Sequence, residues 1–249
     1  MSESLTSVDG RTVLRMEREL AHPPEKVWRA ITDPAELAHW YPALVEADLR
    51  LNGRISFTFA EGEDDFVEDP DNTGVIRAYE PPRLLEFTWG SEVQRWEVEP
   101  TASGCVLKLT STYDDRPGSA SYTSGWILCL DALDQSLGGN SIPRESYQLL
   151  HEHFVKVYGL DAGEKAADGS IRFERQLTAP KEKVWPRLAG KLNVAVPEGN
   201  ELRLGSATLT LRDGNGGARL VLTQTDPAAG DYESWRELIE SVAAESVTY

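Results

Sequence analysis

The chain has 249 residues, of which 40% are hydrophobic and 27% are charged, a balance typical of folded rather than disordered proteins. Asp and Glu total 41 against 25 Lys and Arg, which gives a formal net charge of -16. Because that charge repels phosphate backbones and anionic lipids, we expect neither a nucleic-acid nor a membrane partner. The first ten residues are polar and acidic, and no apolar run could span a bilayer, so we expect a cytoplasmic location.

The chain repeats part of its own sequence. Residues 14–28 read LRMERELAHPPEKVW and residues 171–185 read IRFERQLTAPKEKVW, with Arg, Glu, Arg, Leu, Pro, Glu, Lys, Val and Trp recurring at one fixed offset. A weaker echo joins the segment after Trp126 to the segment after Trp235. We therefore predict a duplication with a shortened second copy. The predicted domains are residues 12–140, a linker with a helix at 141–170, and a truncated repeat at 171–249.

The first copy opens with a strand and two helices. Residues 13–20 alternate between apolar and charged side chains, which is the period of a half-buried strand. Pro23 and Pro24 suit the first turn of a helix, where a missing N–H costs nothing. Asp33 is expected to cap a second, short helix that runs to Trp40.

A meander and a long helix complete the first copy. Six alternating runs separated by Gly, Pro, Asp and Asn predict antiparallel strands at residues 44–49, 54–59, 74–79, 84–89, 93–98 and 106–112. The period then changes to three and four between Tyr122 and Leu137, which predicts an amphipathic helix that ends at Gly138. Because this helix is the only apolar cover available to the sheet, the sequence predicts an α+β domain.

Four phrases carry a family resemblance: PPEKVW at 23–28, TDPAELAHWYP at 32–42, FTWG at 87–90 and GWILCLDALDQSL at 125–137. As an ordered set they resemble the START-like (SRPBCC) superfamily, in the branch similar to the C-terminal domain of the activator of Hsp90 ATPase. The resemblance implies a helix-grip fold, in which a curved antiparallel sheet wraps around the long C-terminal helix and encloses an apolar pocket.

That branch includes small-molecule binding domains, cyclase-like or aromatase-like enzymes and chaperone regulators, so it sets a fold and not a function. The residues before Thr12 are too few for the separate N-terminal domain with which the eukaryotic regulator binds its chaperone. We therefore expect a chaperone partner only as the weaker alternative.

The candidate pocket is lined by aromatic and aliphatic side chains on one face of the sheet and on the helix. The predicted lining residues are Trp40, Ile55, Phe57, Phe59, Phe87, Trp89, Trp96, Leu107, Leu109, Tyr122, Trp126, Leu130 and Leu133. The alternative is that these side chains pack together as a solid core. The charged residues that alternate with them, Arg77, Glu86, Arg95 and Lys108, are expected to point outward and carry no catalytic role.

We expect no metal site and no cofactor. The acidic run at 61–71 lacks the ligand spacing of an EF-hand loop and reads as a solvated hairpin loop. His151 and His153 are two apart in a predicted helix, whereas a metal site on a helix needs a spacing of three or four. Cys105 and Cys129 form no CxxC pair, and the glycines at 214–217 read as a hairpin turn rather than a phosphate-binding loop.

Three functions stay open on these grounds. The first is the binding of a small apolar or aromatic ligand in the pocket. The second is an enzyme of the cyclase, aromatase, dehydratase or hydrolase type acting on such a ligand, with no catalytic residue assigned. The third is a protein-interaction module. A group with a perturbed pKa in the cavity would favour the enzyme, and a filled cavity with an exposed apolar patch would favour the interaction module.

Overall fold

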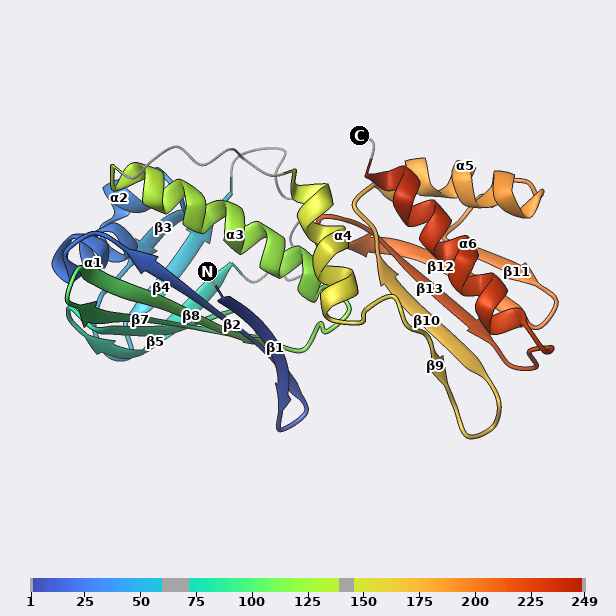
Figure 1. Ribbon diagram of the computed structural model, residues 1–249, viewed down its shortest axis with the longest axis horizontal. Helices are drawn as coiled ribbons and strands as arrows, with labels where there is room; N and C mark the ends of the chain where they lie inside the picture. The colour runs from blue at the N-terminus through green and yellow to red at the C-terminus, as the bar shows by residue number, and fades with distance from the viewer. Residues whose placement is uncertain (1, 60–71, 139–145, 248–249) are drawn as a thin grey trace. The chain divides into compact units, whose positions relative to one another are not determined.

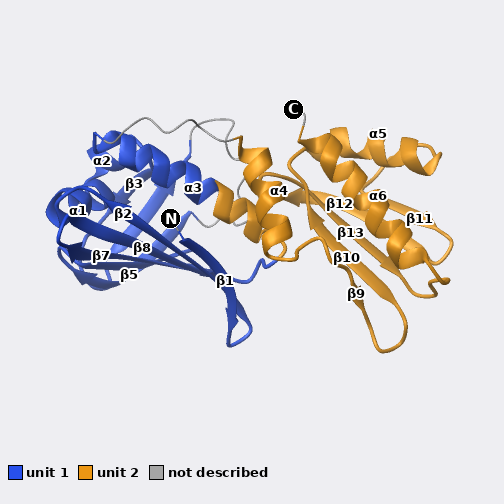
Figure 2. Cartoon of the chain, in the orientation of Figure 1, with its two compact units in different colours: residues 1–64, 69–116, 125–144 blue, residues 65–68, 117–124, 145–249 orange. Residues whose placement is uncertain are grey.

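The computed structural model describes residues 2–59, 72–138 and 146–247, so the acidic run at 61–71 lies outside the described residues. The chain divides into two compact units (Figure 2). Helix α3 (Ser119–Ser136) contributes to both, because its first turns up to Ser124 belong to the second unit and the rest, from Gly125, belongs to the first.

The first unit is built on an eight-stranded antiparallel sheet with the order β1-β2-β8-β7-β6-β5-β4-β3 (Figure 1). Its strands are β1 (Ser2–Val8), β2 (Arg11–Leu20), β3 (Leu44–Ala47), β4 (Arg54–Thr58), β5 (Thr73–Glu80), β6 (Leu84–Trp89), β7 (Glu92–Thr101) and β8 (Gly104–Tyr113). Its helices are α1 (Pro24–Thr32), α2 (Pro34–Leu37) and α3. The predicted helix-grip α+β fold is confirmed, with every predicted strand of the meander present.

Strand β1 lies before Thr12, the residue at which the predicted first domain begins. It pairs antiparallel with β2 along its full length, from Ser2 opposite Glu17 to Val8 opposite Arg11. Its sequence SESLTSV is mostly polar, and most of its side chains are exposed. Because neither face of this strand is fully buried, it lacks the apolar alternation by which a strand is recognised in sequence.

Helices α1 and α2 are joined through Asp33. The backbone N–H of Asp33 donates to Arg29 O and closes α1, while its carboxylate accepts from the N–H of Ala35 and caps α2. The short α2 then brings Trp40 back against α1, where its indole Nε1 donates to Ala30 O at 2.9 Å. Two aromatic side chains, Trp40 and Tyr41, are thereby placed at the inner face of the sheet.

The later part of α3 lies across the inner face of the first sheet. Arg18 of β2 forms a buried ion pair with Asp131 of α3. Farther along, Trp126 packs edge-on against Trp96 of β7, with ring centroids 5.4 Å apart. The alternate residues of β8 from Cys105 to Tyr113 are buried beneath it. Charged and aromatic contacts therefore both hold this part of α3 in place.

The second unit has a five-stranded antiparallel sheet with the order β11-β12-β13-β10-β9. Its strands are β9 (Glu164–Lys165), β10 (Ile171–Gln176), β11 (Glu201–Leu204), β12 (Ala207–Gly214) and β13 (Gly217–Gln224). Its helices, besides the start of α3, are α4 (Tyr147–Val157), α5 (Lys181–Leu192) and α6 (Asp231–Ser246). The glycines at 214–217 form the β12–β13 hairpin turn, as predicted.

The second sheet has the connectivity of part of the first. Read as β9-β10-β13-β12-β11, it has the order of β1-β2-β8-β7-β6, and α5 follows β10 as α1 follows β2. The ion pair recurs too: Arg175 of β10 bonds Glu240 of α6 at 3.0 Å, and Glu240 follows Trp235 by the same five residues that separate Asp131 from Trp126. Among the described residues, β3, β4 and β5 have no counterpart. Two such sheets are consistent with a shortened copy.

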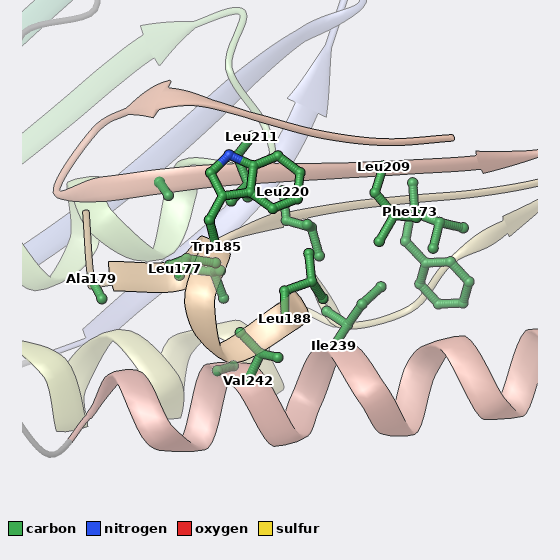
Figure 3. Packing of buried hydrophobic residues seen from close by; sticks show 14 of the residues in the cluster. Phe173, Leu177, Ala179, Trp185, Leu188, Leu209, Leu211, Leu220, Ile239 and Val242 are labelled. Atoms are coloured by element: carbon green, nitrogen blue, oxygen red, sulfur yellow. The ribbon is translucent and has the colours of Figure 1, made fainter. Parts of the chain in front are cut away.

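The interior of the second unit is packed with its own side chains. Helices α5 and α6 both lie on one face of the sheet (Figure 3). Trp185 and Leu188 of α5 enter a cluster with Ile239 and Val242 of α6 and with buried leucines of β12 and β13. Leu188, Val242 and the leucines at 209, 211, 220 and 222 have no exposed surface. The second unit therefore has a conventional solid core.

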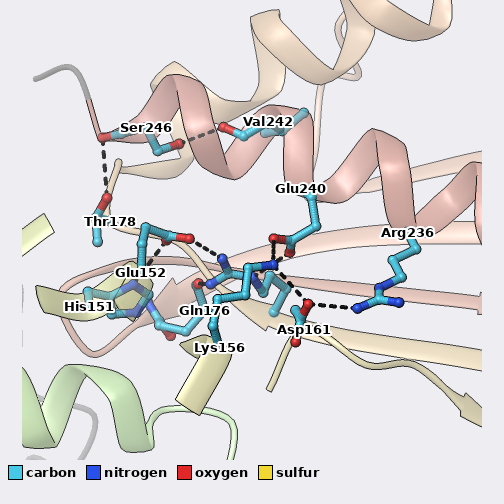
Figure 4. A network of polar contacts seen from close by, with 11 residues as sticks. His151, Glu152, Lys156, Asp161, Gln176, Thr178, Arg236, Glu240, Val242 and Ser246 are labelled. Carbon is cyan, nitrogen blue, oxygen red and sulfur yellow. Dashed lines mark hydrogen bonds and ion pairs between the residues drawn. The ribbon is translucent and has the colours of Figure 1, made fainter. Parts of the chain in front are cut away.

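A polar network joins α4, β10 and α6 (Figure 4). The guanidinium of Arg175, which is 2% exposed, donates to Glu152 of α4 and to Glu240 of α6. The equally buried Arg219 donates to Gln176 Oε1 at 2.7 Å and to Glu174 at 3.2 Å. Because a buried guanidinium is costly unless its donors are satisfied, these contacts fix α4 and α6 against the strand.

We expect Arg175→Met to destabilise the second unit by about 3 kcal/mol, because Glu152 and Glu240 then lose their shared cation while remaining largely buried. Arg172→Met, on the exposed side of the same strand, is the matched control and should cost no more than about 0.5 kcal/mol. Urea unfolding of the full chain measures both. Equal effects of the two substitutions would show that the network does not hold this unit together.

His151 of α4 makes the second unit sensitive to pH. Burial lowers the pKa of His151 below its ordinary 6.5, although its hydrogen bond to Glu152 acts in the other direction. The unfolded chain therefore binds a proton at a higher pH than the folded chain, so stability falls as pH drops below about 6.5. We expect His151→Phe to reduce the loss of melting temperature between pH 7.5 and 5.5, and the exposed His153→Phe to leave it unchanged. Identical pH profiles for all three proteins would contradict this assignment.

Candidate ligand-binding site

The first unit contains a small apolar cavity on the inner side of its sheet. The cavity has a volume of about 50 Å³ and lies among α1, α2 and strands β3, β4, β6 and β7. Its lining residues are Ile31, Thr32, Pro34, Leu37, Trp40, Tyr41, Val45, Ala47, Leu49, Ile55, Phe57, Leu85, Phe87 and Trp96. Pockets that hold small organic ligands usually measure about 300–1,000 Å³, so side chains fill most of this interior.

The side chain that fills the centre is that of Tyr41. Its ring stacks on Phe57 and Trp89, with centroid distances of 6.2 and 6.1 Å and interplanar angles of 21° and 26°. It also meets Trp126 of α3 at 5.6 Å and Trp40 at 5.3 Å. Phe57 and Trp89 stack closely on each other at 4.0 Å. Aromatic residues from β4, β6, α3 and the segment after α2 thus surround one phenol ring.

Two buried polar side chains lie on the same face of the sheet. The hydroxyl of Tyr41 donates to Oε1 of Gln94 at 3.3 Å, and Gln94 is only 1% exposed. Ser111 stands directly opposite Gln94 in the β7–β8 register, and its buried Oγ has no hydrogen-bond partner among the described residues. An apolar interior with a few inward polar groups is the usual composition of a small-molecule site.

The titratable groups here are held in their neutral forms. Burial raises the pKa of Tyr41 well above its ordinary value, and the nearby Cys129 and Glu92 raise it further. Burial also raises the pKa of the Cys129 thiol to about 12. At neutral pH the interior therefore presents a phenol, a thiol and an amide without formal charge.

The predicted pocket residues divide into four groups. Those that line the cavity are Trp40, Ile55, Phe57, Phe87 and Trp96. Phe59 and Trp89 extend the aromatic stack, and Leu107, Leu109, Trp126, Leu130 and Leu133 are buried without lining the cavity. Tyr122 is half-buried in the part of α3 that belongs to the second unit. The structure therefore brings twelve of the thirteen into the first unit.

Sequence reasoning missed Tyr41 and Gln94. A signal for Gln94 existed, because it is two residues from Trp96 and so shares the inner face of β7. Tyr41 lies beside Trp40 and before Pro42 in an irregular segment, where no periodicity indicates its direction. Only the folded chain shows that these two residues, 53 positions apart, are hydrogen-bonded.

The charged residues of the meander lie on the opposite face. Arg95 pairs there with Glu86 and Glu97, and Lys108 pairs with Glu99. In the described part of the chain, no group of three or more His, Cys, Asp or Glu side chains is placed to hold a metal ion. His151 is buried and His153 is exposed, so the two do not face a common site. No helix of the described ranges has the length and apolarity to cross a membrane.

Comparisons with known proteins found structures that resemble part of this chain. A conserved protein of unknown function from Enterococcus faecalis is similar over 63% of this chain and 90% of its own, with 17% identity and a TM-score of 0.52. The protein CalU16 from Micromonospora echinospora matches 64% of this chain and 94% of its own, with 17% identity and a TM-score of 0.46. No curated protein matches the chain in sequence. The family model described as Activator of Hsp90 ATPase homolog 1-like protein matches residues 21–138.

The E. faecalis structure supports the fold and carries no function to this chain, since its identity is low. The matched segment runs from just before α1 to the end of α3, and so contains the cavity, Tyr41 and Gln94. Residues 21–138 are therefore similar to the Activator of Hsp90 ATPase homolog 1-like family, which supports the START-like resemblance expected from the sequence.

Proposed function

We propose that the first unit binds a small hydrophobic or aromatic molecule between the inner face of its sheet and α3. The observation that carries this proposal is the aromatic interior around Tyr41, which holds two inward polar side chains, Gln94 and Ser111. A core that serves stability alone gains nothing from an unsatisfied buried hydroxyl, because desolvating it costs free energy. A bound ligand with a hydrogen-bonding group would remove that cost.

Binding is better supported than catalysis at this site. A general acid or base works best with a pKa near the operating pH. The environment of Tyr41 and Cys129 moves both pKa values upward, away from neutrality. Both groups therefore stay protonated at pH 7, which suits recognition of a neutral molecule.

We assign the ligand to the first copy, proposed as residues 12–140, rather than to the truncated repeat, proposed as 171–249. Residues of β3 and β4, such as Val45, Ala47 and Phe57, make one wall of the cavity in the first unit. These strands have no counterpart among the described residues of the second unit. The solid core around Trp185 also favours a structural role for the second unit over a role in ligand binding.

The test is native mass spectrometry and thermal unfolding of the full chain against a panel of apolar and aromatic metabolites. A ligand that binds only the folded protein must raise its melting temperature. We expect a subset of aromatic compounds to do so. If none binds at concentrations up to the solubility limit, the pocket proposal is wrong and a protein-interaction role takes its place.

We expect Ala47→Phe to weaken binding of any such compound at least tenfold, because the added ring fills the cavity from β3. Val75→Phe is the matched control, since Val75 is exposed on β5 and lies outside the lining. Titration by calorimetry measures both dissociation constants. Equal affinities of the two variants would place the ligand elsewhere.

A further inference from the structure

The ring of Tyr41 occupies the place in the first unit where an aromatic ligand would fit. It borders the small cavity on one side and contacts Phe57, Trp89 and Trp126 on the others. Cavity and ring are therefore adjacent parts of one interior space. If the ring moved out, the two volumes would join, with aromatic surfaces already arranged around them.

Tyr41 is held less firmly than Trp40 and Trp96. Its side chain is half-buried, whereas Trp40 and Trp96 are 5% and 2% exposed. Its side-chain hydrogen bond to Gln94 is long at 3.3 Å, while Trp40 donates to a backbone carbonyl at 2.9 Å. It also lies in the irregular segment between α2 and β3, so its ring can rotate toward solvent without breaking a helix or a strand.

The contacts of Tyr41 also indicate which chemical groups a ligand would need in order to take the place of the Tyr41 side chain. Its ring lies nearly parallel to those of Phe57 and Trp89, which selects a flat aromatic ring. Its hydroxyl donates a hydrogen bond to Oε1 of Gln94, which selects a hydroxyl or another neutral donor at the same position. The buried Oγ of Ser111, which has no hydrogen-bond partner within the described ranges, lies opposite Gln94 in the register and offers a second polar contact.

We propose that Tyr41 is a displaceable occupant of the ligand site, and that the ligand is a planar aromatic molecule with a hydroxyl group. The ligand ring takes the place of the Tyr41 ring, and its hydroxyl donates to Gln94. This inference rests on the proposed function and adds to it the class of ligand and the residue that must move. Gln94 is then the residue that discriminates hydroxylated from plain aromatic compounds.

The experiment uses 4-methylphenol, which has the structure of a tyrosine side chain, and toluene, which lacks the hydroxyl. We expect Tyr41→Ala in the full chain to bind 4-methylphenol at least tenfold more tightly than the wild type does, and to prefer it over toluene. Tyr79→Ala is the control, because Tyr79 is a half-buried tyrosine of the same unit that contacts Trp28 outside the cavity lining. It should gain no affinity for either compound. Calorimetry and thermal shifts provide the readout.

Adding Gln94→Leu to Tyr41→Ala should abolish the preference for 4-methylphenol over toluene. If Tyr41→Ala does not fold, Tyr41→Phe serves instead: it leaves Gln94 without its donor, so 4-methylphenol should stabilise it more than it stabilises the wild type. Equal binding of 4-methylphenol to wild type and Tyr41 variants, or a preference that survives Gln94→Leu, would overturn the inference.

These outcomes separate the two proposals. If the wild type binds a ligand from the metabolite panel but the Tyr41 and Gln94 variants behave like it, the displacement mechanism is wrong and the binding function stands. If Tyr41→Ala binds 4-methylphenol while no compound binds the wild type, Tyr41 is a permanent part of the core, and both the displacement and the binding function are wrong.

Discussion

The structure depends on one buried ion pair between the first long strand and the last helix of a copy. In the first unit Arg18 of β2 meets Asp131 of α3, and in the second unit Arg175 of β10 meets Glu240 of α6. A guanidinium that is removed from water needs a charged or polar acceptor. The net stabilisation from forming a buried ion pair is small, but removing one partner is strongly destabilising because it leaves the other charge buried and unpaired. We infer that the pair sets the position of the helix along the sheet. In the first unit that position brings Trp126 against Trp96 and Tyr41, and so determines the shape of the interior.

The two units differ in the number of strands in the sheet that the last helix faces, which is eight in the first unit and five in the second. The first sheet continues beyond β6 through β5, β4 and β3, and residues of β3 and β4 line a cavity. The second ends at β11, and its α5 and α6 lie directly on a compact apolar cluster. Both units thus share the ion pair, and the longer sheet of the first unit is the one whose added strands line a cavity.

Much of the fold could be predicted from the sequence because its signals are local. Alternation marked β6 at its observed bounds, and the three-and-four spacing marked most of α3. The site was harder, because it depends on tertiary contacts. The inward aromatic side chains of β4 and β6 were identified from their alternation, whereas Tyr41 lies in an irregular segment and Gln94 is a polar residue on an apolar face. Strand β1 was missed because an exposed edge strand carries almost no hydrophobic pattern.

The ligand proposed for the first unit takes the place of the Tyr41 ring, between the segment that follows α2 and the side chains of β4 and α3. Hydrogen–deuterium exchange of the full chain, with and without the compound that most stabilises it, tests this most directly, because a bound ligand suppresses local opening where it binds. Protection concentrated in residues 33–58 and in the later part of α3, with residues 171–247 unchanged, is the predicted result. Protection confined to the second unit, or no local protection despite a higher melting temperature, would contradict the account.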